Sequence, residues 1–185
     1  MYLKNVKRLI NRHNIDAYII PKNDEYFSEY SNPNRLKAVT NFTGSAGLAL
    51  ILKKKNFLFV DGRYTLQALK QSGSNFNILE IPKYNPDKLL RKFKNSLKIG
   101  YDPKLFTNNY LEKNFLTQAL LFPIIENIFI KNRKDNSENV FYDLDEKVTG
   151  EKYQSKIKKL VRYLKINKVS NLFISAPENV AWLLN

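Results

Sequence analysis

The sequence predicts an α/β fold in which a mixed β-sheet is flanked by helices on both faces, followed by an incomplete second α/β domain. Segments with helical spacing of apolar residues alternate with short apolar runs of strand length. Two of these runs are separated by only four residues, which indicates an antiparallel hairpin. Both runs are apolar throughout, which is typical of strands that helices cover on both faces.

The helices are predicted from apolar spacing and from capping residues. Residues 2–13 form an amphipathic pattern, and Asp61 is expected to cap a helix over about residues 62–72 that closes near Gly73. The remaining helices are a short one that Asn85-Pro86 begins, one from Thr107 through Leu120, and one marked by Tyr153, Ile157, Leu160, Val161 and Leu164.

The strands are predicted from short apolar runs bounded by turn residues. They are expected at residues 16–20, 46–52, 57–60, 76–81, 97–101, 122–129 and 172–174. The hairpin connects the second and third of these through Lys53–Asn56. Residues 22–35 are rich in Asn, Asp, Ser and Pro, so we expect a loop there with one helical turn around Glu25–Tyr30.

Composition changes along the chain predict three parts. Residues 1–130 form a first domain, residues 131–147 are polar and charged like a linker, and residues 148–185 are the start of a second, truncated α/β domain. Such a short segment cannot bury a core of its own. We therefore expect poor solubility, or association through apolar side chains that remain partly uncovered, namely Ile157, Leu160, Leu172 and Ile174.

Composition also limits the classes of function. No apolar run approaches the roughly 18 residues needed to cross a bilayer, and the N-terminus lacks a signal-peptide pattern. The absence of cysteine excludes disulfides, thiolate metal sites and a cysteine nucleophile. A cytoplasmic protein is the simplest expectation.

The net charge of +14 raises the question of a nucleic-acid partner. Of the 31 basic residues, 24 are Lys and 7 are Arg, although Arg is preferred for contacts to phosphates and bases. The 23 Asn residues and the abundant Ile, Tyr and Phe indicate the codon usage of an AT-rich genome. This interpretation disfavours nucleic acid, while a basic RNA- or acidic-surface-binding module stays open as an alternative.

The segment Thr43–Gly47 has two interpretations, a phosphate-binding loop or a tight turn. Phosphate loops follow a strand and open a helix, whereas these glycines lead into a strand. We therefore predict a turn with positive φ at Gly44 or Gly47.

The segment Asp61–Tyr64 contains a cation in the expected first turn of a helix. Asp61 is sufficiently explained as the cap. Arg63 faces the positive end of the helix dipole at a cost of roughly a few tenths of a kcal/mol, which suggests that it meets an anion or carboxylate. His13, the only histidine, is predicted to be a solvated surface residue. No pattern of catalytic residues is present.

Several strings recur in a known order and spacing. They are Asp16–Pro21, Ser28–Tyr30, Phe42–Gly47, Asp61–Tyr64, Gly100–Pro103 and Ala181–Asn185. Together they resemble the N-terminal part of Xaa-Pro aminopeptidases (aminopeptidase P) of the three-domain cytosolic type. Phe27 departs from this pattern, because the family tends to have Gln before the Ser-Glu-Tyr string.

The resemblance implies a creatinase-like N-terminal domain, then a related α/β domain, then a catalytic "pita-bread" domain. That third domain would hold two divalent metals, usually manganese, and would cleave the bond before a proline. Its metal ligands and catalytic residues would all lie beyond Asn185. The resemblance therefore implies no catalytic residue, metal ligand or cofactor in this chain, which we expect to be inert alone.

The resemblance also implies roles and partners for this chain. It would shape the substrate entrance, limit substrates to short Xaa-Pro peptides and mediate subunit contact. Its partners would be the missing catalytic domain, or a separately encoded catalytic half, and a second copy of the chain; no membrane is involved. Arg63 is carried over as a substrate-binding residue, and the structural residues are Gly44, Gly47, Asp61 and Gly62.

Overall fold

The computed structural model describes residues 2–30, 33–115, 118–126, 128–129 and 142–185. The chain forms two compact units, Met1–Asn132 and Arg133–Asn185. The predicted linker comprises residues 131–147, and its part up to residue 141 is not among the described residues. Its last two residues belong to a short helix, α6 (Glu146–Thr149), which Asp145 caps.

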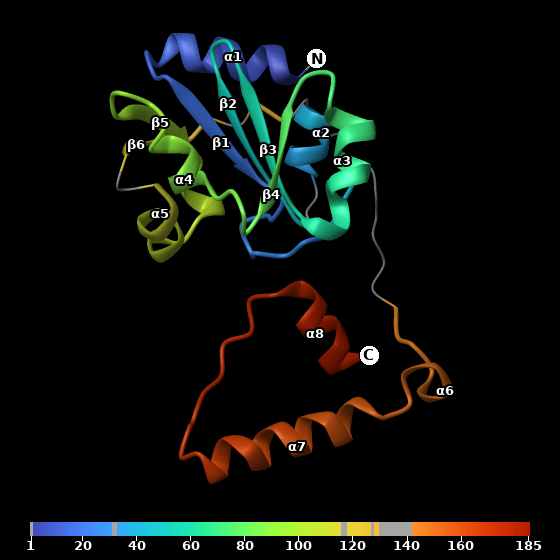
Figure 1. The fold of residues 1–185 in the computed structure, drawn as a ribbon. Coiled ribbons are helices and arrows are strands. Elements are labelled where there is room, and N and C mark those ends of the chain that lie inside the picture. The colour runs from blue at the N-terminus through green and yellow to red at the C-terminus, as the bar shows by residue number, and fades with distance from the viewer. Residues whose placement is uncertain (1, 31–32, 116–117, 127, 130–141) are drawn as a thin grey trace. The chain divides into compact units, whose positions relative to one another are not determined.

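The first unit contains a six-stranded sheet with the order β4-β3-β2-β1-β5-β6 (Figure 1). Its strands are β1 (Ala17–Pro21), β2 (Leu48–Leu52), β3 (Asn56–Asp61), β4 (Asn77–Ile81), β5 (Leu97–Tyr101) and β6 (Ala119–Pro123). β2 is antiparallel to both of its neighbours, and every other pair is parallel. The predicted mixed sheet and its hairpin are confirmed.

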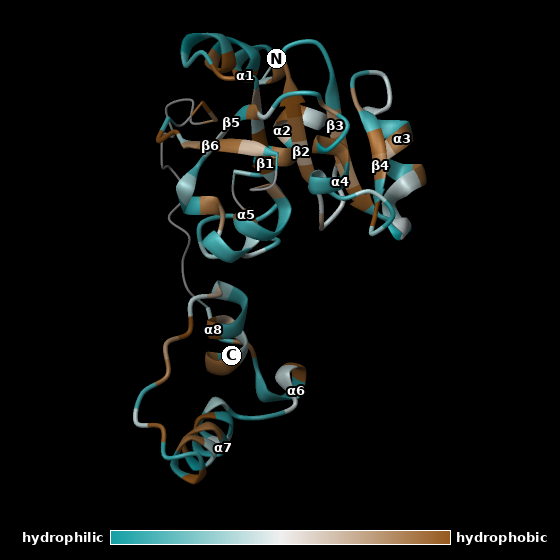
Figure 2. Cartoon of the chain, turned by 60° about the vertical axis from the view of Figure 1, so that its left-hand side comes forward, coloured by the Kyte–Doolittle hydropathy of each residue, from teal (hydrophilic) through white to brown (hydrophobic). Residues whose placement is uncertain are grey.

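Helices cover both faces of this sheet, as the uniformly apolar strands indicated. One face packs against α1 (Tyr2–Arg12), α2 (Arg35–Thr40) and α3 (Thr65–Ser72), and the other against α4 (Pro86–Leu90) and α5 (Asn108–Phe115). Alternate residues of a strand point to opposite faces. Ile51 accordingly joins the core under α1, whereas Leu50 joins the core under α4 and α5. Figure 2 shows the hydrophobic colour concentrated along the central strands.

Capping side chains fix where the helices begin. Asp61 caps a 3₁₀ turn, η1 (Gly62–Tyr64), which leads directly into α3. Asn85 caps α4, with Pro86 at its first position, and Asp102 caps a second 3₁₀ turn, η2 (Pro103–Leu105). These side chains accept hydrogen bonds from backbone N–H groups that have no partner within the helix.

Three predicted elements of the first unit differ from the structure. α5 ends at Phe115 rather than reaching residue 120, because the chain forms β6 from Ala119 in parallel register with β5. The strand predicted at 122–129 is therefore misplaced, since β6 is Ala119–Pro123. Residues 25–30 form turns and not a helical turn. α2 was not predicted, although Asn34 caps it through the N–H of Lys37.

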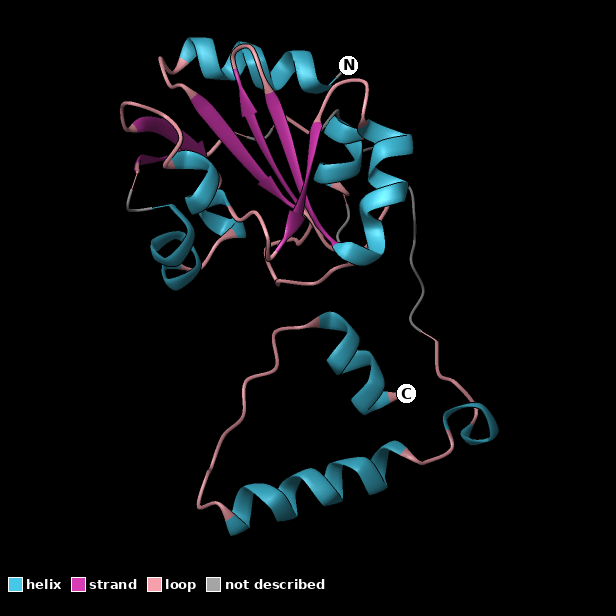
Figure 3. Ribbon diagram, viewed as in Figure 1, coloured by secondary structure: helices cyan, strands magenta, loops and turns pink. Residues whose placement is uncertain are grey.

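The second unit contains α6, α7 (Tyr153–Ile166) and α8 (Pro177–Leu184). The predicted strand at 172–174 is wrong, because no described strand of this unit pairs with it; the segment is drawn as loop in Figure 3. Among the described residues of this unit, Lys156 alone is buried. No helix in the described part of the chain is long and apolar enough to cross a bilayer.

Candidate functional site

The carboxyl ends of five strands lie at one edge of the sheet. β1, β3, β4, β5 and β6 run in the same direction, so Pro21, Asp61 and Tyr101 end their strands at this edge. β2 runs against them and begins there at Leu48. We call this side the carboxyl edge. In open α/β sheets, ligands bind beyond the carboxyl ends of the strands.

The two glycines of Thr43–Gly47 are needed for close packing and not for positive φ. Neither Gly44 nor Gly47 adopts positive φ, so that prediction was wrong. A Cβ atom on Gly44 would lie 2.2 Å from Cζ of Phe42. On Gly47 it would lie 3.1 Å from Cδ2 of Leu36 and 3.2 Å from the carbonyl oxygen of Phe59. The segment therefore wraps tightly over the core before β2 begins.

Arg63 forms a bidentate ion pair with Asp61. Its Nη2 lies 2.8 Å from Oδ2 of Asp61 and its Nε 3.1 Å from Oδ1, which also accepts the backbone N–H of Arg63. These hydrogen bonds lower the pKa of Asp61 and raise that of Arg63. The Arg63 charge is thus balanced within its own turn, which removes the dipole argument for a further anion. Its side chain is 77% exposed at the carboxyl edge.

Hydrogen bonds attach the Thr43–Gly47 segment to η1 and α3. Oγ of Ser45 lies 2.8 Å from the hydroxyl of Tyr64, and the amide of Gln71 donates to Oγ1 of Thr43 at 2.9 Å. The ring of Tyr64 packs edge-on against Phe42. The segments before β2 and after β3 are therefore joined into one wall of the carboxyl edge.

A polar groove of about 350 Å³ opens beside this wall, and we call it the charged groove. It is lined by Lys22, Glu29, Tyr30, Asn34, Thr43 and Ser45. Nζ of Lys22 donates to the backbone carbonyl of Glu29. Burial lowers the pKa of Lys22, while the carboxylates of Glu29 and Asp24 oppose that effect. The groove therefore presents charges of both signs together with hydroxyl and amide groups.

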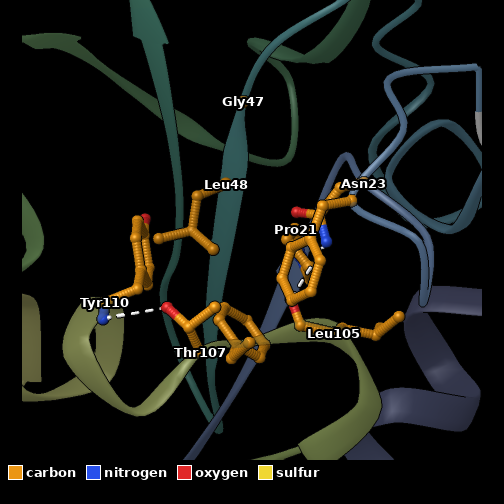
Figure 4. Close-up of a pocket in the computed structure, with 9 residues that line it drawn as sticks. Pro21, Asn23, Gly47, Leu48, Leu105, Thr107 and Tyr110 are labelled. Carbon is orange, nitrogen blue, oxygen red and sulfur yellow. Dashed lines mark hydrogen bonds between the residues drawn. The ribbon is translucent and has the colours of Figure 1, made fainter. Parts of the chain in front are cut away.

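A second cavity, of about 160 Å³, lies where the segments after β1 and β5 diverge, and we call it the apolar pocket (Figure 4). Nine residues line it: Pro21, Asn23, Phe27, Gly47, Leu48, Leu105, Phe106, Thr107 and Tyr110. The side-chain amide of Asn23 donates to the carbonyl of Leu105 at 3.0 Å, which joins the two segments. β1 continues toward α2 on one face, whereas β5 continues toward α5 on the other. Such a divergence is the usual ligand position in this class of sheet.

His13 lies away from this edge, at the C-terminal end of α1. Its Nε2 is 3.1 Å from Oε2 of Glu126, and Arg12 pairs with the same carboxylate through Oε1 at 2.5 Å. Hydrogen bonds from His13 and Arg12 lower the pKa of Glu126. His13 is on the surface, as predicted, but it is part of an ion-pair cluster that the sequence did not reveal.

The described residues do not fit a metal centre. Nowhere in the described ranges do three His, Asp or Glu side chains gather as a metal ion requires. A two-metal site such as the resemblance implies therefore has no donor set on this part of the molecule, and no chemical step is assigned to one here.

Several residues of the carboxyl edge were missed by sequence reasoning. Lys22, Asn23 and Phe27 come from the loop after β1 and Tyr110 from α5, two segments that only the sheet topology brings together. One signal was present, because Lys22 and Asn23 directly follow the buried strand β1. Polar residues in that position commonly serve a site beyond the strand.

The fold and its edge define a class of protein: an α/β domain with a mixed sheet between helices and two cavities at the carboxyl edge of that sheet. The chain belongs to the creatinase/prolidase N-terminal domain family. Residues 3–120 match the family model of that description, and residues 132–185 match a second model with the same description.

Relatives match along nearly the whole chain. A probable Xaa-Pro aminopeptidase P from Coprinopsis cinerea is 31% identical over 195 residues, which cover 97% of this chain and 31% of that protein. Xaa-Pro aminopeptidase 1 from Dictyostelium discoideum is 29% identical, covering 99% of this chain and 32% of that protein. The chain thus spans about a third of the length of these relatives.

Solved structures agree with the fold. The cytosolic X-prolyl aminopeptidase of Caenorhabditis elegans, described as having a di-nuclear active site, superposes with a TM-score of 0.64 at 25% identity. The match covers 91% of this chain and 30% of that one. A creatinase/prolidase-like N-terminal domain from Corynebacterium diphtheriae has a TM-score of 0.53 at 19% identity, covering 66% of this chain and 93% of that domain. These relatives give the RNA- or acidic-surface-binding alternative no support.

Proposed function

We propose that this chain is the N-terminal, non-catalytic portion of a Xaa-Pro aminopeptidase. It shapes the access of short Xaa-Pro peptides and contributes to subunit contact, and it acts in the cytoplasm. The observation that carries this proposal is the match of 97% or more of the chain to proteins named as Xaa-Pro aminopeptidases. The di-nuclear active site named for the Caenorhabditis elegans relative supports a two-metal catalytic part, with manganese as the metal we expect.

The carboxyl edge is the surface we assign to substrate. The exposed guanidinium of Arg63 lies at this edge, beside the wall that adjoins the charged groove. Charges of both signs with hydroxyl and amide groups suit the backbone and the termini of a peptide. The partners we propose are the catalytic part, in the same or a separate chain, and a second copy of this chain.

Two measurements test the proposal. The 185-residue chain, incubated with manganese and a short Xaa-Pro peptide, is expected to show no turnover, and clear hydrolysis would contradict a non-catalytic role. The chain is then fused in place of the matching third of the Caenorhabditis elegans enzyme. The fusion is expected to hydrolyse short Xaa-Pro peptides and to reject long ones, whereas a fusion that treats both lengths alike would refute a role in substrate access.

The Arg63 assignment has its own control within this fusion. Arg63→Gln is expected to raise KM for short peptides, and Arg91→Gln is the matched change. Arg91 is also an exposed arginine that pairs with a nearby aspartate, Asp87, but it lies at the end of α4 and lines neither cavity. Equal effects of the two substitutions would contradict a specific role for Arg63.

A further inference from the structure

The apolar pocket has the size and lining of a site for a single apolar side chain. Its volume of about 160 Å³ is close to the roughly 150 Å³ of an engineered apolar cavity that binds benzene. Leu48, Leu105 and Phe106 form buried apolar parts of the lining. The rings of Phe106 and Tyr110 lie 5.8 Å apart and extend that lining outward.

Two polar side chains of the pocket, Asn23 and Thr107, already have structural partners. The amide of Asn23 donates to the carbonyls of Asp24 and Leu105, both at 3.0 Å. Oγ1 of Thr107 accepts the backbone N–H of Tyr110 at 3.2 Å, as Figure 4 shows. These two groups fix the shape of the pocket, and the apolar residues of its lining offer contact surface to a ligand.

Phe27 lines the pocket in a backbone conformation that is unfavourable for a bulky residue. Its φ is 61°, in the left-handed region, and its side chain is 52% exposed. Asp24 holds the loop in this shape, because its carbonyl accepts the N–H of Phe27 and its Oδ1 accepts the N–H of Ser28. Strained residues of this kind cluster at ligand sites. The strain places an exposed aromatic ring beside an apolar cavity, where a ligand would cover it.

We propose that the apolar pocket binds one apolar side chain of a peptide, either a phenyl ring or a branched aliphatic group. The loop that supplies Asn23 and Phe27 also supplies Lys22 and Glu29 to the charged groove, so this loop borders both cavities. An apolar side-chain pocket beside charged and hydrogen-bonding groups matches the chemistry of a peptide. That the side chain belongs to a peptide rests on the proposed function. That the pocket binds apolar groups does not depend on it.

The test uses the 185-residue chain and three probes, the N-acetyl amides of phenylalanine, leucine and glycine. Binding is measured from the chemical shifts of backbone amides by NMR. The phenylalanine and leucine probes are expected to give saturable shifts at residues 22–27, 47–48 and 105–110, and the glycine probe none. Shifts elsewhere, or equal binding of the glycine probe, would overturn the proposal. This readout needs no catalytic part, so it can fail or succeed independently of the fusion enzyme.

Two matched variants separate binding from folding. Phe27→Asn removes the ring and introduces a residue that tolerates positive φ, so stability is expected to hold while affinity falls about tenfold. Tyr26→Asn is the control, because Tyr26 is an exposed aromatic of the same loop that does not line the pocket. Unchanged affinity in Phe27→Asn, or the same loss in both variants, would refute the role of Phe27.

A last arm identifies the occupant. In the fusion enzyme described above, the phenylalanine probe is expected to bind the same pocket and to compete with short peptides. A pocket that binds the probe in the 185-residue chain but not in the fusion would be filled by the protein itself. That result would overturn the peptide as its occupant.

Discussion

The ring of Phe42 occupies the space that a side chain on Gly44 would need, since a Cβ atom there would lie 2.2 Å from Cζ of Phe42. Gly44→Ala is therefore expected to displace a fully buried ring and to lower the free energy of unfolding by about 1 to 3 kcal/mol. Urea denaturation measures the change. Gly62→Ala is the control, because its Cβ would meet Oε1 of Glu80 at an ordinary 3.4 Å. Equal losses in both variants would contradict the packing explanation.

The Asp61–Arg63 pair makes the free energy of unfolding depend on pH. The pKa of Asp61 is lowered from its ordinary 3.8, chiefly by the hydrogen bond from Arg63, so the folded state binds fewer protons than the unfolded state. The resulting stabilisation is present above the unfolded pKa and is lost as the pH falls through the folded pKa. Asp61→Asn should therefore be destabilising at about pH 6 and much less so at about pH 3. A pH-independent difference would argue against this pair as the cause.

Lys156 holds the helices of the second unit together. Its Nζ donates to the carbonyl of Trp182 at 2.7 Å and to Oδ1 of Asn185 at 2.6 Å, and it lies 4.5 Å from the centre of the Trp182 ring. Lys156→Met should release α8 and speed amide exchange there about tenfold, because hydrogen bonds to charged groups are strong. Lys158→Met, an exposed neighbour on α7, should leave exchange unchanged. Equal exchange in all three proteins would refute the role of Lys156.

The apolar side chains of the second unit remain partly uncovered, as predicted. Leu172 is 52% exposed, and Ile157, Leu160 and Ile174 are half-buried. Amide exchange in this unit is therefore expected to be faster than in the first unit's sheet. The chain should also associate with rising concentration, as sedimentation velocity would detect. Leu172→Gln should reduce that association. Amide exchange in the second unit as slow as that in β2 would contradict the exchange prediction.

Local signals made most of the first unit predictable. Residues 97–101 were predicted as a strand with both boundaries of β5 correct, and Asn85 and Asp61 cap the elements that follow them, as predicted. These features depend on neighbours in sequence. The end of α5 was not predictable in this way, because Leu120 and Leu121 suit a helix and a strand equally well until pairing with β5 decides.

The candidate site was predictable only in part. Asp61 and Arg63 are only two positions apart in the sequence, yet their ion pair removed the reason first given for expecting an external anion. Gly44 and Gly47 lack the expected positive φ, whereas Phe27, a bulky residue for which this conformation is unfavourable, adopts it. The apolar pocket combines residues that are more than 80 positions apart in the sequence, such as Asn23 and Leu105. No local sequence pattern could therefore predict it.

The reversed direction of β2 has a practical consequence for anyone who wishes to attach a probe. Because β2 begins at the carboxyl edge, the turn Lys53–Lys55 that follows it lies at the opposite end of the sheet, and all three of its residues are at least partly exposed. Exposed loop tips of this kind accept insertions well. A fluorophore or an affinity tag placed at Lys54 would report on the protein from the side farthest from both cavities.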